Sequence, residues 1–209
     1  CIQGNLFVMD VPVWYESDGK VSPVWLSICE EERNQTTNLM ERLTDYSNLH
    51  KAYQQVRRNG GSSGVDKQSI EEFGVWFNIY YQTLQDELLS GTYVPQPVKG
   101  VQIPKPKGGF RQLGIPTVKD RVVQQAINQV LQPLYDPKFS PSSFGFRPRR
   151  GAHDALRRAC EIVKSGKSTV VDIDLAKFFD EVNHNRLLWL LSTRIGDKRM
   201  LSLISRILK

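Results

Sequence analysis

The amino-acid sequence predicts an α+β fold that is mostly helical and contains short extended regions. Apolar residues recur at helical spacing through most of residues 37–209, which predicts amphipathic helices. Residues 98–115 instead contain two extended runs around a Pro/Gly turn, and residues 168–175 form a run rich in β-branched residues. The chain has 209 residues, of which 40% are hydrophobic and 24% charged, enough for one domain or two small ones.

The composition excludes several classes of protein. No stretch approaches the roughly 20 apolar residues that a membrane-spanning helix needs. The three cysteines are far apart and form neither a CxxC pair nor a zinc-like cluster with histidine. The first residues lack the pattern of a secretory signal. We therefore expect a cytoplasmic protein of bacterial type, without disulfides or structural zinc.

Basic residues are concentrated in the middle of the chain. Residues 1–50 contain 3 Lys and Arg against 8 Asp and Glu, whereas residues 51–209 contain 25 against 14. The excess is largest in residues 99–150, where 10 basic residues accompany 2 acidic ones. Such a concentration points to a polyanion, with nucleic acid the leading candidate, although a merely solvated surface can have the same composition.

The first 35 residues are expected to form an N-terminal extension. Residues 5–28 contain two β-rich runs joined by Asp18-Gly19, a favoured tight-turn pair. Pro12 and Pro23 place this hairpin at a sheet edge, because proline donates no ladder hydrogen bond. Self-association into a homodimer through this edge is one expectation.

Two short helices are expected next. The first is capped by Thr36 or Thr37 and ends near Leu43. The second is capped by Ser47 and stops at the glycine-rich residues 59–64.

The following helix has the clearest start signal in the chain. Ser69 and Glu72 have the spacing of a capping box, and the helix is expected to run to about Leu89. Its aromatic and aliphatic stripe predicts a buried face rather than a ligand site. The stripe consists of Phe73, Trp76, Phe77, Tyr80, Tyr81, Leu84 and Leu88.

A β-hairpin and another helix come next. Residues 98–103 and 110–115 are the predicted strands, and residues 104–109 form a turn with lysines at its tip. Thr117 and Asp120 have capping-box spacing, which predicts a helix start directly after the hairpin.

The rest of the chain alternates between loop, helix and strand. A Pro- and Ser-rich loop over residues 135–150 precedes a helix over 152–163. The β-branched residues 168–175 are predicted to form a strand, followed by helices at about 183–195 and from Asp197 onward, the last of which seems cut short by the end of the sequence.

Two aspartates in the predicted strand are the strongest chemical signal. Asp172 and Asp174 would share one face of a strand whose other face is apolar. Two such carboxylates are costly to bury unless they are neutralised, and Mg²⁺ prefers hard oxygen ligands. Pairing with Arg or Lys is the alternative. Other catalytic patterns are absent, since His153 and His184 have no acid or cysteine partner at catalytic spacing.

Four segments resemble, in order, the motifs of group II intron-encoded reverse transcriptases and maturases. Residues 172–184, DIDLAKFFDEVNH, resemble the first palm motif of that family. Residues 64–66, Gly-Val-Asp, resemble its N-terminal element, and residues 103–116 and 143–148 resemble its two fingers motifs. The resemblance covers about residues 38–209.

The resemblance implies a right-hand polymerase that copies RNA into DNA by two-metal phosphoryl transfer. Residues 36–150 would form the fingers and residues 151–209 the beginning of the palm. Asp174 would be the catalytic metal-binding aspartate, with the Leu175 carbonyl as a further Mg²⁺ ligand and Asp172 as its catalytic neighbour.

The same resemblance implies residues for the incoming deoxynucleoside triphosphate (dNTP). Lys105 and Arg111 flank the fingers turn and would hold the triphosphate. Phe179 would be the bulky gate that excludes a ribose 2′ hydroxyl, with Phe178 the competing candidate. Core packing is expected for one of these two rings.

The implied nucleic-acid partners are intron RNA and an RNA template with a DNA primer. Phe144 and Phe146 lie between arginines and offer stacking surfaces beside cations, although Phe144 is equally suited to anchoring its loop. The expected RNA contacts are Arg57, Arg58, Lys119, Arg121, Arg147, Arg149 and Arg150.

The chain also departs from the family pattern. It contains no tyrosine-alanine-aspartate-aspartate element, which supplies the second metal-binding pair in the family, and no thumb. We therefore expect this segment alone to be inactive in polymerisation and to act within a longer protein. An RNA-binding maturase module without polymerase activity and a related reverse transcriptase of a bacterial defence system are the alternatives. A generic metal-dependent hydrolase is disfavoured by the fingers motifs.

Overall fold

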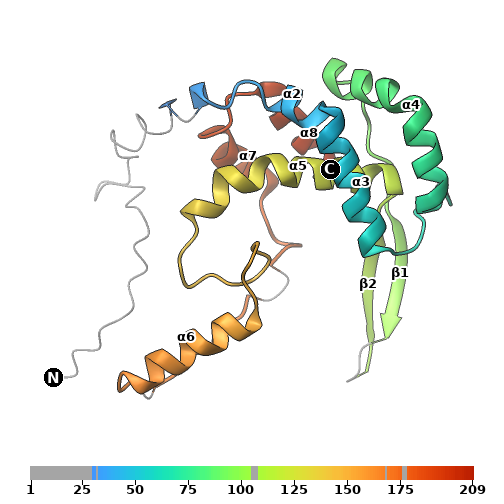
Figure 1. Cartoon of the computed structure of the whole chain (residues 1–209). Coiled ribbons are helices and arrows are strands. Elements are labelled where there is room, and N and C mark those ends of the chain that lie inside the picture. Colours follow the sequence, from blue (N-terminus) through green and yellow to red (C-terminus); the bar gives the residue numbers. More distant parts are fainter. Residues whose placement is uncertain (1–29, 32, 105–107, 168, 176–177) are drawn as a thin grey trace. The chain divides into compact units, whose positions relative to one another are not determined.

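The fold was obtained as a computed structural model and contains two compact units (Figure 1). The larger unit comprises residues 26–131 and 184–209, and the smaller one contains residues 132–183. The structure describes residues 30–31, 33–104, 108–167, 169–175 and 178–209. The N-terminal hairpin expected over residues 5–28 therefore lies outside the described residues.

The described elements confirm an α+β fold that is mainly helical. None of the helices in the described part of the chain has both the length and the apolar character needed to cross a bilayer. In order, the elements are α2 (Leu39–Thr44), α3 (Tyr46–Asn59), α4 (Ile70–Ser90), β1 (Lys99–Pro104), β2 (Phe110–Ile115), α5 (Val118–Tyr135), the 3₁₀ helix η1 (Asp136–Lys138), α6 (Ala152–Lys164), α7 (His184–Ser192) and α8 (Lys198–Ile207).

Local capping signals explain where most helices begin and end. The Ser69 and Glu72 capping box is confirmed, since each side chain accepts from the backbone N–H of the other residue. Gly91 ends α4 in the left-handed conformation that glycine adopts without strain. The prediction for α3 was wrong by two residues: Asp45 is the cap and accepts from the Ser47 N–H at 2.9 Å. Similarly, α2 begins after Asn38, which makes no side-chain cap.

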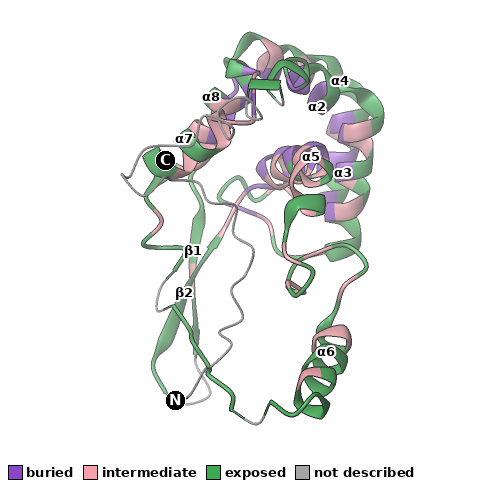
Figure 2. Cartoon of the chain, turned by 90° about the vertical axis from the view of Figure 1, so that its left-hand side faces the viewer, coloured by how far each residue is buried: buried purple, intermediate pink, exposed green. Residues whose placement is uncertain are grey.

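The core of the larger unit joins α2, α3, α4, α5 and α8. The expected buried face of α4 is confirmed, because Phe73, Phe77, Leu84 and Leu88 are fully buried, although Tyr80 is half exposed. Figure 2 shows the buried positions on the facing sides of these helices. The buried residues that complete the core are Leu39, Met40, Leu43, Leu49, Ala52, Val56, Ile70, Tyr93, Val118, Val122, Val123, Ala126, Ile127, Val130, Ile195, Met200, Leu203 and Ile204.

The C-terminal helix α8 packs against α2, the first helix of the larger unit. The buried Asp197 carboxylate caps α8 by accepting from the Arg199 N–H, and it also accepts from the Met40 N–H of α2, both at 3.0 Å. Thr36 donates its hydroxyl to the Arg194 carbonyl at 2.7 Å and accepts from the Gly196 N–H at 3.0 Å. Residues 184–209 thus belong to the same compact unit as α2, and α8 packs against α2.

The predicted β-hairpin is confirmed. Strands β1 and β2 pair antiparallel, with Lys99 opposite Ile115 and Pro104 opposite Phe110. Nearly all residues of both strands are exposed, and the hairpin projects from the helices of its unit (Figures 1 and 2).

The smaller unit differs from the prediction. Residues 169–175 form neither a helix nor a strand, and no neighbouring strand pairs with them among the described residues. An unpaired segment cannot make ladder hydrogen bonds, and Val170, Val171 and Ile173 are about four-fifths exposed. Helix α6 forms where predicted and has no buried residue.

Candidate functional site

The predicted site residues fall into both compact units. Asp172, Asp174, Phe178, Phe179 and the arginines of the 136–150 loop lie in the smaller unit. The larger unit carries the remaining described candidates, which are Arg57, Arg58, Arg111, Lys119 and Arg121. Lys105 lies outside the described residues.

The two aspartates are exposed on a segment that forms neither a helix nor a strand. Asp172, Asp174 and Leu175 are all exposed, so carboxylate and carbonyl oxygens are available to a cation. This donor set suits Mg²⁺, which takes one or two carboxylates and completes its shell with water and substrate phosphates. The described residues contain no group of three or more acidic, histidine or cysteine side chains that could enclose a metal. That the pair forms part of a metal site stays a prediction, which the exposure of both carboxylates allows.

The two phenylalanines after the aspartates contact each other. Their rings meet edge to face, with centroids 5.4 Å apart. Phe178 is 51% exposed and Phe179 83% exposed. The expectation that one of them is a core residue is therefore wrong for this structure, because no described element covers either ring.

Arg111 is on the exposed surface of the hairpin. It lies on β2 opposite Ile103, close to the turn, and its side chain is open to solvent. A planar guanidinium at such a position can form two hydrogen bonds to a phosphate group.

Arg147 organises its own loop instead of facing RNA. Its side chain is only 6% exposed and forms an ion pair with Asp136 at 2.8 Å. It also donates to the carbonyls of Asp136, Ser140 and Ser143 at 2.7, 2.8 and 3.2 Å. The hydrogen bond from Arg147 lowers the pKa of the Asp136 carboxyl. The sequence prediction of an RNA contact is corrected here, because the guanidinium is already occupied and covered.

Elsewhere in the 136–150 loop, aromatic and basic side chains are less covered than Arg147. Arg150 stacks over Phe144 with 5.6 Å between its guanidinium carbon and the ring centroid, and it donates to the Ser143 carbonyl. Phe146 and Arg149 are exposed and have positive φ values of 54° and 58°. The loop therefore places one ring and one cation in solvent at strained backbone positions.

Lys119 and Arg121 are held by contacts within the larger unit. Lys119 pairs with Glu87 at 2.7 Å and lies over the rings of Trp76 and Tyr93. Arg121 donates to the carbonyls of Gly60 and Ser62 at 3.1 and 2.9 Å, which ties the loop after α3 to α5. Burial lowers the pKa of the Arg121 guanidinium, which stays charged at neutral pH.

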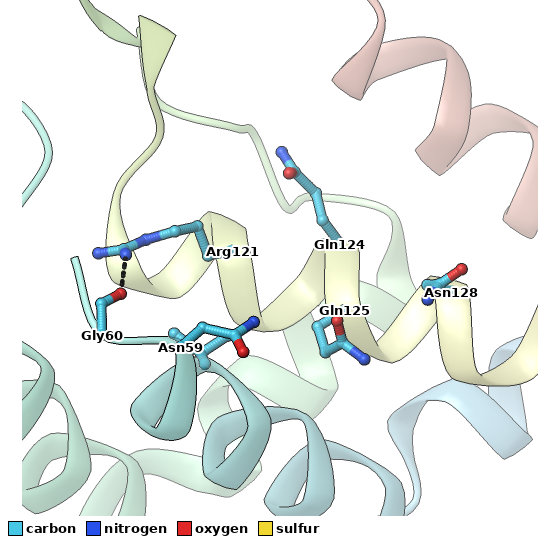
Figure 3. A pocket seen from close by; sticks show the side chains of 7 residues that line it. Asn59, Gly60, Arg121, Gln124, Gln125 and Asn128 are labelled. Atoms are coloured by element: carbon cyan, nitrogen blue, oxygen red, sulfur yellow. Dashed lines mark hydrogen bonds between the residues drawn. The ribbon is translucent and has the colours of Figure 1, made fainter. Parts of the chain in front are cut away.

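A polar hollow lies beside this contact. Its volume is about 280 Å³. Figure 3 labels residues that line it, namely Arg121, Gln124, Gln125 and Asn128 on α5 and Asn59 and Gly60 at the end of α3. Arg57 and Arg58 are exposed in the last turn of α3, and the described residues provide no ion pair for either. The carboxamide side chains of Gln124, Gln125 and Asn128 were not predicted to belong to a site. The only indication of them in the sequence is that Gln and Asn recur along α5.

Comparisons with known proteins agree with the sequence motifs. Residues 103–208 match the family described as reverse transcriptase (RNA-dependent DNA polymerase). The chain is 37% identical to Protein YkfC of Escherichia coli K12 over 153 residues, which is 71% of this chain and 39% of that protein.

Two further relatives are named for introns. The chain is 34% identical over 161 residues to the Group II intron-encoded protein LtrA of Lactococcus lactis subsp. cremoris, covering 76% of this chain and 26% of LtrA. It is 28% identical over 180 residues to the Putative COX1/OXI3 intron 1 protein of Saccharomyces cerevisiae, covering 85% of this chain and 21% of that protein. The chain thus spans less than two-fifths of the length of each of these three relatives.

The predicted resemblance to group II intron-encoded reverse transcriptases and maturases is confirmed by these names. The family match includes strand β2 with Arg111 and the segment with Asp172 and Asp174. The chain therefore belongs to the reverse transcriptase (RNA-dependent DNA polymerase) family.

Proposed function

We propose that the full-length protein containing this chain is an RNA-directed DNA polymerase of the group II intron type, which also binds intron RNA as a splicing maturase. The observation that carries this proposal is the family match over residues 103–208, which includes the exposed Asp172 and Asp174. Residues 36–150 act as fingers and residues 151–209 as the beginning of the palm.

Asp174 and the Leu175 carbonyl would hold Mg²⁺, with Asp172 beside them. The bound ion supplies activation of the primer 3′ hydroxyl and stabilisation of the triphosphate charge. The acidic side chains contribute their charge and their position, and their exposure leaves room for the primer end and the triphosphate. The tyrosine-alanine-aspartate-aspartate element missing from this sequence would complete the set, so the segment alone is inactive.

The triphosphate is assigned to the hairpin and the phenylalanine pair. Arg111 binds the phosphate oxygens through charge-assisted hydrogen bonds, together with Lys105, which lies outside the described residues. Phe179 is the larger obstacle to a 2′ hydroxyl because it is the more exposed of the two rings, while Phe178 supports it edge to face. An aromatic side chain at this position favours deoxyribonucleotides by steric exclusion.

RNA binding is assigned to the cations that the structure leaves accessible. These are Arg57 and Arg58 at the end of α3, and Arg149 beside Phe146 in the 136–150 loop. Lys119, Arg121 and Arg150 make contacts within the protein and contribute mainly long-range charge.

Template-dependent synthesis tests the polymerase proposal. The full-length protein is incubated with an RNA template, a DNA primer, dNTPs and Mg²⁺, beside Asp174→Ala and the control Glu161→Ala, which removes an exposed acid of α6 outside the palm motif. We expect DNA synthesis by the wild type and by Glu161→Ala, and none by Asp174→Ala. Tight intron-RNA binding without DNA synthesis by the wild type would instead favour the maturase module, for which the accessible cations suffice.

The salt dependence of RNA binding tests the interface. A folded group II intron RNA is titrated with wild type, with Arg57→Ala/Arg58→Ala, and with Arg42→Ala as a control on another exposed arginine. Each lost phosphate contact reduces the slope of log K against log salt by about 0.7–0.9. The double variant is expected to lose about 1.5 from the slope while the control loses none. Equal slopes for all three proteins would remove these arginines from the interface.

A further inference from the structure

The hairpin that carries Arg111 has almost no packing of its own. Of the described residues of β1 and β2, only Val101 and Ile115 are even partly covered. Buried apolar area is what normally holds an element against its neighbours. The orientation of the hairpin must therefore be set where its two ends join the helices of the larger unit.

Both ends of the hairpin meet at one buried carboxylate. Asp120, in the first turn of α5, is 3% exposed and accepts from the Gln96 N–H at 3.2 Å, on the segment leading into β1. It accepts from the Thr117 hydroxyl at 2.6 Å, on the segment leaving β2. It also accepts from the buried Tyr93 hydroxyl, on the way from α4 to β1. One side chain thus joins residues before and after the hairpin.

The Tyr93 hydroxyl is a dependable donor to this carboxylate. Burial and the hydrogen bond to Asp120 raise the pKa of Tyr93 well above its ordinary value, so the hydroxyl stays protonated throughout the physiological range. Asp120 therefore accepts hydrogen bonds from three donors, two before the hairpin and one after it.

Two further contacts hold the same segments in place. Gly64 lies against the backbone after β2, where an added Cβ would be 2.7 Å from Thr117 Cα and 2.8 Å from Thr117 N. Only glycine allows this approach, which gives a physical reason for the glycine in the Gly-Val-Asp element. On the other side, Arg206 of α8 donates to the Tyr93 carbonyl at 2.9 Å and to the Gly91 carbonyl.

We propose that Asp120 is a positioning residue which, with Tyr93, Thr117 and Gly64, fixes the direction in which the fingers hairpin projects and thereby the position of Arg111. These residues are called the hairpin root. The orientation follows from the contacts alone. Its consequence for triphosphate binding rests on the proposed polymerase function.

Distances between spin labels test the orientation. Cysteines replace Gln102 on β1 and Gln54 on α3, which are both exposed, in a chain whose native cysteines at 1, 29 and 160 are serine. The width of the label-to-label distance distribution is then measured by pulsed electron paramagnetic resonance. The root variants are Tyr93→Phe, which removes one donor and is the milder change, and Asp120→Asn.

The matched control is Tyr81→Phe. Tyr81 also donates its hydroxyl within the larger unit, to the Thr44 carbonyl at 3.0 Å, but it does not contact the hairpin root. We expect the distribution to broaden about twofold or more in Tyr93→Phe and further in Asp120→Asn, and to keep its width in Tyr81→Phe. Equal widths in Tyr93→Phe and Tyr81→Phe would overturn the proposal.

Kinetics of the full-length protein separate this proposal from the proposed function. If Arg111 is misplaced, Tyr93→Phe should raise KM for dNTPs about fivefold or more with a smaller change in kcat, while Tyr81→Phe alters neither. A wild type that makes no DNA contradicts the polymerase proposal and leaves the spin-label result to decide on the hairpin root. A wild type that makes DNA, with unchanged KM in Tyr93→Phe, contradicts the positioning role.

Discussion

The contact between α2 and α8 depends on one buried carboxylate, which makes Asp197→Ala an informative substitution. Asp197 accepts from two backbone N–H groups, one in its own helix at Arg199 and one in α2 at Met40. The Arg199 guanidinium adds two more hydrogen bonds, at 3.2 and 3.1 Å. Alanine removes the helix cap and the tertiary acceptor together.

The cost can be worked out from these contacts. Loss of an N-cap costs about 1 kcal/mol, and a buried N–H left without an acceptor costs about 1–3 kcal/mol. The Arg199 side chain is 45% exposed and also reaches Glu41 at 2.7 Å, so it is not left as an unpaired buried charge. We therefore expect a loss of about 3 kcal/mol in the free energy of unfolding, roughly a 150-fold change in the equilibrium constant.

Asp45→Ala is the control, because Asp45 also caps a helix, but its side chain is exposed and accepts its hydrogen bonds from Ser47 in the same turn. Urea unfolding followed by circular dichroism gives both free energies, and hydrogen exchange of the α2 amides shows whether the loss is local. We expect about 1 kcal/mol for Asp45→Ala, leaving a difference of about 2 kcal/mol that reports the Met40 contact. Equal losses in the two variants would refute the reasoning.

Three further predictions concern single contacts. Gly74→Ala should lower the free energy of unfolding by about 1–3 kcal/mol, because the added Cβ would collide with the Tyr53 hydroxyl. This loss is expected despite the better helix propensity of alanine. Urea unfolding of Gly74→Ala combined with Tyr53→Phe should show that part of the lost stability returns. Arg147→Lys should speed hydrogen exchange and proteolysis across residues 136–150, because an ammonium cannot replace the guanidinium contacts; unchanged protection would contradict that role. Burial would raise the pKa of Asp197, but hydrogen bonds from Arg199 and the Met40 N–H outweigh it and lower the pKa. The stability that the ionised Asp197 contributes is therefore complete above about pH 4 and is lost as the pH falls through the lowered pKa. When the free energy of unfolding is measured against pH, Asp197→Asn should lose less stability in acid than the wild type, and identical curves would contradict this.

Local signals in the sequence were sufficient where neighbouring residues decide the structure. The Ser69 and Glu72 capping box and the Pro/Gly turn between β1 and β2 act over a few residues, and both predictions are confirmed. The cap of α3 was assigned to Ser47 instead of Asp45 because both residue types favour that position. The choice depends on where α2 ends, which the sequence pattern does not define.

Long-range contacts decided the features that could not be predicted. Residues 169–175 have strand composition but no paired neighbour among the described residues, and a strand requires a partner. Arg147 and Arg149 look equivalent in the sequence, yet the first is buried against Asp136 and the second is exposed. The three-donor role of Asp120 was likewise hidden, because its partners before the hairpin lie 24 and 27 residues away in the chain.

In the proposed function, Asp174 is needed for nucleotide transfer and not for RNA binding. The most direct measurement is single-turnover incorporation of one dNTP by the full-length protein on a preassembled RNA template and DNA primer, with template–primer affinity measured on the same preparation. For Asp174→Ala we predict affinity within about twofold of wild type and a rate lower by about 10³-fold, which corresponds to roughly 4 kcal/mol of lost metal-assisted stabilisation. An Asp174→Ala enzyme that binds equally well and incorporates within about tenfold of the wild-type rate would contradict the claim.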